Sequence, residues 1–214
     1  MANLGFHLLL LFLSFHYNLT SATAADHPPT ISTTNFIEAA CKTTRYYTLC
    51  IQSLSSYSHT IQQSDQQLAR AALAVTLNKA QSTANFVAKL SKSSSGGIYI
   101  KPRESQALKD CIDNMVDSVD QLNQSMEEMG RLGNRVSGQN FIWHMSNVQT
   151  WVSAALTDEN TCLDGFSGPD LSGNLKGVIR RRIVYVAQVT SNALALVNRF
   201  ADTHRPGSTS NHSP

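Results

Sequence analysis

The chain has 214 residues, of which 42% are hydrophobic and only 15% are charged, and its formal net charge is +2. This length predicts one domain, and the apolar content is sufficient for a hydrophobic core. Nucleic-acid-binding domains need clustered positive charge, so nucleic acid is not an expected partner. The one basic run, Lys176 with Arg180, Arg181 and Arg182, is typical of a solvated helix face, with contact to an anionic polysaccharide as the alternative.

The N-terminus has the anatomy of a secretory signal peptide. A short apolar run from Leu8 to Phe15 precedes small residues that end in Ala22-Thr23-Ala24. The run is shorter than the roughly 20 apolar residues that span a bilayer. Residues 1–24 are therefore predicted to be cleaved off, with a buried N-terminal helix as the alternative. Because no later segment is long and apolar enough to cross a membrane, we expect a secreted protein without membrane contact after cleavage.

Secretion makes the cysteines and the sequons informative. An even number of cysteines in an oxidising compartment predicts two disulfides, and four cysteines allow three pairings. No Cys-x-x-Cys pair and no nearby histidine is present, so no metal site is expected. Two Asn-x-Ser sequons beyond the predicted signal peptide, at Asn123 and Asn211, are glycosylation candidates.

Helical periodicity runs through the chain, and no stretch shows sustained strand alternation. Two short helices or turns are predicted over Asn35–Cys41 and Tyr46–Leu54. Four long helices follow, each with one apolar stripe, over residues 64–90, 102–129, 140–163 and 175–200. One helix cannot bury its own stripe, so the predicted fold is all-α: an antiparallel up-down-up-down four-helix bundle with an N-terminal helical hairpin. The domain is predicted to cover residues 25–204, and the polar residues 205–214 to form a disordered tail.

This arrangement predicts the disulfides. Cys111 lies 18 residues before Met129, and Cys162 lies 22 residues after Asn140. At about 1.5 Å per residue, both cysteines lie roughly 27–33 Å from the turn that joins their helices. Antiparallel neighbours bring them level, so Cys111 is expected to pair with Cys162, and Cys41 with Cys50 in the hairpin.

Four stretches in a set order carry a family resemblance. They are Cys41–Cys50, Ala107–Cys111, Thr150–Thr157 with Thr161-Cys162, and Thr190–Ala195. Together they resemble the plant invertase/pectin methylesterase inhibitor family, over nearly all of the predicted mature chain. The resemblance implies a four-helix bundle with a helical hairpin, in which the first cysteine is bonded to the second and the third to the fourth. It also implies an extracellular protein of the apoplast or cell wall, without a cofactor.

The family has two main targets, pectin methylesterase and acid invertase, and this chain is more similar to the pectin methylesterase branch. In that branch the inhibitor packs bundle helices across the enzyme's pectin cleft as a one-to-one complex. The resemblance places five residues against the enzyme: Asp113, Asp117, Asp120, Thr161 and Asp164. Inhibition of acid invertase is the alternative. The invertase branch uses a Pro-Lys-Phe motif in the last loop, where this chain has Gly168-Pro169-Asp170-Leu171.

The three aspartates have physical features that suit a binding role. They are spaced i, i+4, i+7, and each is two residues from a position of the apolar stripe, so they are expected to point away from the core. A solvated helix face is the alternative interpretation. Carboxylates there can accept hydrogen bonds from donors lining a cleft that binds a polyanionic sugar.

Enzymatic functions are not predicted. His144 is expected to be partly buried in the bundle rather than catalytic, and Ser153 is not in a nucleophile elbow. Three exposed acids without a pocket are not typical of an acid–base catalytic site. The domain also resembles the pro-region of some plant pectin methylesterases, but no enzyme domain follows it here. A wall protein with a signalling or storage role is the remaining alternative.

Overall fold

The computed structural model describes residues 31–94, 102–133, 137–167 and 174–204. The predicted signal peptide, the predicted C-terminal tail, the sequon at Asn211 and the Gly168–Leu171 stretch lie outside these residues. Within the described residues, every regular element is helical. None of the described helices is apolar over a length sufficient to cross a membrane.

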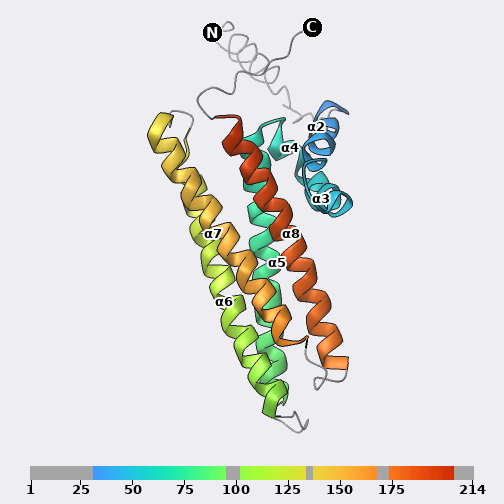
Figure 1. Cartoon of the computed structure of the whole chain (residues 1–214). Coiled ribbons are helices and arrows are strands. Elements are labelled where there is room, and N and C mark those ends of the chain that lie inside the picture. The colour runs from blue at the N-terminus through green and yellow to red at the C-terminus, as the bar shows by residue number, and fades with distance from the viewer. Residues whose placement is uncertain (1–30, 95–101, 134–136, 168–173, 205–214) are drawn as a thin grey trace, which may run out of the picture. The chain divides into compact units, whose positions relative to one another are not determined.

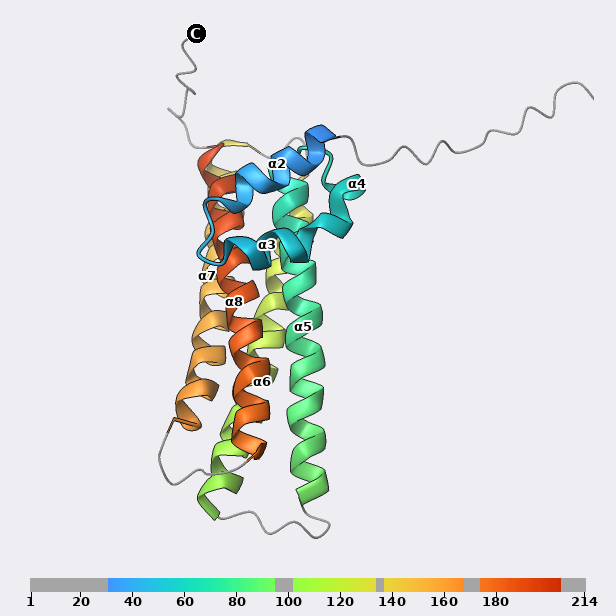
Figure 2. The ribbon, with the colours of Figure 1, turned by 90° about the vertical axis from the view of Figure 1, so that its right-hand side faces the viewer.

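Four long helices form the body of the domain, as the periodicity predicts (Figure 1). They are α5 (Asp65–Ser94), α6 (Pro102–Arg131), α7 (Gly138–Gly165) and α8 (Asn174–Asp202). Helix α5 packs on α6 and α8, and α7 packs on the same two helices. The result is the antiparallel up-down-up-down bundle, in which the α5–α8 pair and the α6–α7 pair form opposite sides (Figure 2).

A helical hairpin packs on one end of the bundle, where α5 begins and α8 ends (Figure 2). It consists of α2 (Ile31–Cys41), α3 (Tyr47–Leu54), a 3-10 turn (Ser55–Tyr57) and the short α4 (Ser58–Ile61). The buried side chain of Asn192 on α8 holds it in place, because its amide donates to the Tyr46 carbonyl at 2.9 Å and its oxygen accepts from the Tyr46 N–H at 3.1 Å. The sequence did not predict α4 or the left-handed turn at Gln62 and Gln63 that leads into α5.

The predicted apolar stripes form the core. On α7 and α8 every predicted stripe position is buried, and on α5 and α6 the exceptions are only half-buried: Leu77, Ala84, Val119 and Met126. Cys41 is bonded to Cys50 and Cys111 to Cys162, the pairing that the antiparallel arrangement predicts. The second bond joins α6 to α7 with a Cα–Cα distance of 4.4 Å.

Two carboxyl groups are buried in this core, which the sequence analysis did not predict. Glu159 on α7 is fully buried, and its Oε1 lies 2.9 Å from both Ser118 Oγ on α6 and Thr190 Oγ1 on α8. Glu128 on α6 is also fully buried and accepts from Arg131 and from Asn147. Glu159 therefore links α7 to α6 and α8, and Glu128 links α6 to α7.

Candidate functional site

The three aspartates of the predicted site form one exposed stripe along α6. Asp113, Asp117 and Asp120 are all exposed, whereas Cys111, Met115, Ser118 and Leu122 between and beside them are buried. The helical period separates the two sets, because residues spaced i, i+4, i+7 share a face. The stripe thus points away from the core, as its spacing predicts.

The disulfide brings the remaining two predicted site residues to the same end of the α6–α7 pair. Asp113 is two residues after Cys111, while Thr161 and Asp164 flank Cys162, and all three are exposed. At about 1.5 Å per residue, each lies within roughly 3 Å of the bridge along its helix axis. Asp117 and Asp120 continue the surface along α6, about 9 and 13 Å from the bridge.

All five residues present hydrogen-bond acceptors. The Thr161 hydroxyl donates its proton to the Thr157 carbonyl at 2.9 Å, which leaves its lone pairs for an outside donor. The aspartate side chains, when ionised, only accept. This surface therefore fits a partner that offers N–H or O–H donors, above all Arg and Lys, whose bonds to carboxylates are charge-assisted.

Asp158 on α7 is a half-buried carboxyl group next to this surface that the sequence did not predict. Burial raises the pKa of its carboxyl group, a hydrogen bond from Gln121 on α6 opposes that shift, and the charge of Asp117 adds to it. Asp158 Oδ2 and Gln121 Oε1 are both buried without a hydrogen-bond partner among the described residues. Asp158 precedes Thr161 by three residues on the same helix, and this spacing is the signal that would have found it.

The charge of the bundle is distributed unevenly. Helices α6 and α7 carry ten Asp and Glu against three Lys and Arg, whereas α5 and α8 carry nine Lys and Arg against two Asp. The net charge of the whole chain is only +2, because the acidic and the basic helices nearly cancel. The predicted site therefore belongs to an acidic side of the molecule, which favours approach of a basic surface.

The His144–Glu128 pair links α7 to α6. His144 Nδ1 lies 2.7 Å from Glu128 Oε1, and the histidine side chain is 20% exposed, so its predicted partial burial is confirmed. Burial favours the neutral form of Glu128, but hydrogen bonds from Asn147 and His144 and the charges of His144 and Arg131 outweigh it and lower its pKa. Among the described residues, no hydroxyl is hydrogen-bonded to His144 that would act as its nucleophile.

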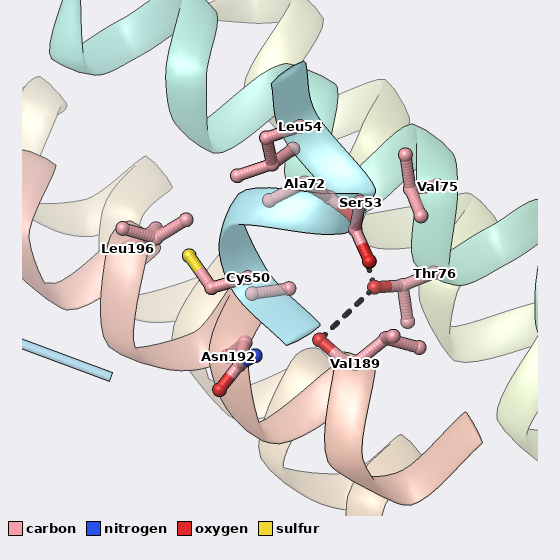
Figure 3. Close-up of a pocket in the computed structure, with 10 residues that line it drawn as sticks. Cys50, Ser53, Leu54, Ala72, Val75, Thr76, Val189, Asn192 and Leu196 are labelled. Atoms are coloured by element: carbon pink, nitrogen blue, oxygen red, sulfur yellow. Dashed lines mark hydrogen bonds between the residues drawn. The ribbon is translucent and has the colours of Figure 1, made fainter. Parts of the chain in front are cut away.

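A small hollow lies where α3 meets α5 and α8 (Figure 3). It has a volume of only about 10 Å³ and is lined mainly by apolar side chains, with Ser53 and Asn192 at its edges. Thr76 Oγ1 lies 2.9 Å from the Ala72 carbonyl and 3.3 Å from the Val189 carbonyl, so the hydroxyl is occupied. This volume suffices for about one water molecule, and the hollow is a packing seam rather than a substrate site.

The sequon at Asn123 lies inside α6 rather than in a loop. Asn123 is half-buried, and Ser125 is fully buried with its hydroxyl donating to the Gln121 carbonyl at 2.9 Å. Glycan acceptors are typically found in surface loops, so this placement disfavours Asn123. Glycosylation at Asn123 and at Asn211 stays a prediction.

The fold defines a disulfide-linked helical domain with an acidic side, and the comparisons identify its family. The family described as plant invertase/pectin methylesterase inhibitor matches residues 35–196, and the chain belongs to this family. Pectinesterase inhibitor 9 of Arabidopsis thaliana is 48% identical over 194 residues, covering 90% of this chain and 94% of that protein. Pectinesterase inhibitor 11 of the same plant is 45% identical over 203 residues, covering 94% and 98%.

A solved structure agrees with the bundle topology. A mutant form of a pectin methylesterase inhibitor from Arabidopsis superposes with a TM-score of 0.59 at 20% identity, covering 76% of this chain and 95% of that one. At this identity the likeness supports the fold alone. The family resemblance and the fold class predicted from the sequence are therefore confirmed.

Proposed function

We propose that this protein is a secreted inhibitor of plant pectin methylesterase. In this proposal it binds the enzyme one-to-one, covers the pectin-binding cleft with α6 and α7, and has no catalytic activity of its own. Relatives named pectinesterase inhibitor, 45–48% identical over at least 90% of the chain, support the inhibitor role. The observation that carries the choice of surface is the exposed acceptor stripe on the disulfide-linked α6–α7 pair.

The size of this face suits a stable complex. Helices α6 and α7 have 30 and 28 residues. Side by side they offer a face about 45 Å long and about 20 Å wide, or roughly 900 Å². A standard protein–protein interface buries roughly 800 Å² on each partner, so the pair is large enough without the rest of the domain.

The mechanism that follows is steric exclusion directed by charge. A cleft that binds a polyanionic sugar presents cationic and other donor groups. The carboxylates of Asp113, Asp117 and Asp120 accept hydrogen bonds from these donors in place of the polymer's carboxylates.

The test is a titration of plant pectin methylesterase and of acid invertase with purified, oxidised mature protein at pH 5 and pH 7. Inhibition of the esterase with a one-to-one end point, checked by native mass spectrometry, is the expected result. Asp113→Asn/Asp117→Asn/Asp120→Asn is expected to raise the half-inhibitory concentration by at least about tenfold. Glu38→Gln, which removes one exposed charge from α2, is the control for a charge lost outside the stripe and is expected to leave the half-inhibitory concentration unchanged.

Two results contradict the proposal. Inhibition of invertase alone would show that the family's other target applies to this chain. An unchanged half-inhibitory concentration for the triple variant would remove the stripe from the interface. Secretion is tested separately by the N-terminal sequence of protein recovered from apoplastic fluid, which is expected to begin after Ala24 or Ala25.

A further inference from the structure

The side of the bundle opposite the acidic stripe is basic over most of its length. On α5 and α8 the only acidic residues are Asp65, which begins α5, and Asp202, which ends α8. Both lie at the hairpin end, and Asp65 is paired with Arg199 at 2.8 Å. From Gln66 to Ser94 and from Asn174 to Ala201 these two helices carry no carboxylate, and they face the viewer in Figure 2.

A groove of about 410 Å³ lies between α5 and α8 in this acid-free part. Three cations line it together with three hydroxyl groups and one aliphatic side chain; the lining residues are Lys79, Ser82, Thr83, Val178, Arg181, Arg182 and Tyr185. One of the cations lies against Gly177, since Arg181 Nη1 is 3.4 Å from the position that a Cβ there would occupy. We call this feature the α5–α8 groove.

Aromatic rings, rather than carboxylates, contact two of the cations. Arg182 Cζ lies 3.9 Å from the centre of the Phe86 ring, and Lys79 Nζ lies 5.7 Å from the centre of the Tyr185 ring. Among the described residues no ion pair joins Lys79, Arg181 or Arg182 to a carboxylate. Contact with a ring orients a cation without neutralising its charge. The Arg182 and Lys79 side chains are therefore held in place and keep their positive charge.

We propose that the α5–α8 groove binds an acidic polysaccharide, namely de-esterified polygalacturonate. Positioned cations match the regularly spaced carboxylates of a polyuronate, and the groove's hydroxyl groups match its sugar hydroxyls. Tyr185, 37% exposed, offers an apolar ring with a polar tip at the rim. An anionic membrane surface would need apolar side chains to insert, and the lining has only Val178 as an aliphatic residue.

The choice of this polymer, among polyanions, rests on the proposed function, since polygalacturonate is the product of the enzyme that the protein is proposed to inhibit. The groove and the acidic stripe lie on opposite sides of the bundle. The protein can therefore hold de-esterified pectin through α5–α8 while α6–α7 contacts the enzyme.

The experiment measures binding of the full mature protein to immobilised polygalacturonate, to fully methyl-esterified homogalacturonan and to vesicles with anionic lipid. Binding to polygalacturonate is expected to weaken with added NaCl and to exceed binding to the esterified polymer and the vesicles. Lys79→Gln/Arg181→Gln/Arg182→Gln is expected to weaken it by about tenfold, because exposed ion pairs are individually weak and three are removed. The control Lys42→Gln/Arg45→Gln/Lys109→Gln removes three exposed cations elsewhere and is expected to keep the affinity.

Equal affinity of both triple variants for polygalacturonate would overturn the proposal, as would equal binding of anionic vesicles by the wild-type protein. Circular dichroism and the melting temperature of each variant establish that it is folded. Inhibition of pectin methylesterase, measured on a fully esterified substrate, is expected to be unchanged by the groove variant Lys79→Gln/Arg181→Gln/Arg182→Gln. Loss of polymer binding and loss of inhibition are thus separate results, and each proposal fails on its own assay.

Discussion

Replacing Glu159 by glutamine is expected to remove most of the pH dependence of stability between pH 5 and pH 8. Burial raises the pKa of the Glu159 carboxyl group to about 8; the hydroxyls of Thr190 and Ser118 oppose the shift, and the charge of Asp158 adds to it. Thr190 Oγ1 lies 2.9 Å from Glu159 Oε1 and 3.0 Å from the Val186 carbonyl. A hydroxyl has one proton, so a protonated Glu159 supplies the second hydrogen bond.

The sign and size of the effect follow from linkage. The carboxyl group has an ordinary pKa of 4.5 in the unfolded chain and about 8 when folded. Between these two pH values the folded state therefore binds more protons than the unfolded state. The contribution of Glu159 to the free energy of unfolding is fully present below pH 4.5 and is lost as the pH rises through the folded pKa. Between pH 5 and pH 8 the loss amounts to roughly 3–4 kcal/mol, or about 10 °C in Tm for a domain of this size.

The assay is urea unfolding of the oxidised protein at four pH values from 5 to 8, for wild type and Glu159→Gln. From pH 5 to pH 8 the free energy of unfolding of the wild type is expected to fall by roughly 3–4 kcal/mol more than that of the variant. Asp158→Asn is the neighbouring control, because burial also raises the pKa of Asp158, and it is expected to remove only a small part of the slope. Parallel curves for wild type and Glu159→Gln would refute the reasoning.

Three further predictions concern what holds the helices together. Cys111→Ser/Cys162→Ser, which opens a bridge between residues 51 positions apart, is expected to lower the free energy of unfolding by roughly 3–4 kcal/mol in urea titrations. Glu128→Gln weakens its contacts to α7 and to Arg131 and is expected to cost about 1–3 kcal/mol at pH 6, with an unchanged Tm as the contrary result. Asn192→Ala removes both bonds to the hairpin, so faster limited proteolysis before α5 is expected, whereas Asn198→Ala at an exposed position is expected to leave the rate unchanged.

The helices, the disulfide pairs and the outward direction of the aspartate stripe could all be predicted from the order of residues alone. All three depend on spacing along one chain: stripes at 3- and 4-residue intervals, cysteines equidistant from a turn, and aspartates two residues from stripe positions. Glu159 continues the 4-3 spacing between Ala155 and Cys162, and this spacing places it on the apolar stripe of its helix. It was missed because an ionisable group is expected outside unless partners are known.

Which helices share a side of the bundle depends on how they pack in three dimensions, and the sequence did not predict it. The order around the bundle places α5 beside α8 and α6 beside α7, and this order turns a small net charge into an acidic and a basic side. The burial of Glu128 and Glu159 was likewise decided there, because their partners come from helices or turns distant in sequence. Electrostatic and hydrogen-bond energies depend on distance in space, which the order of residues along one chain does not contain.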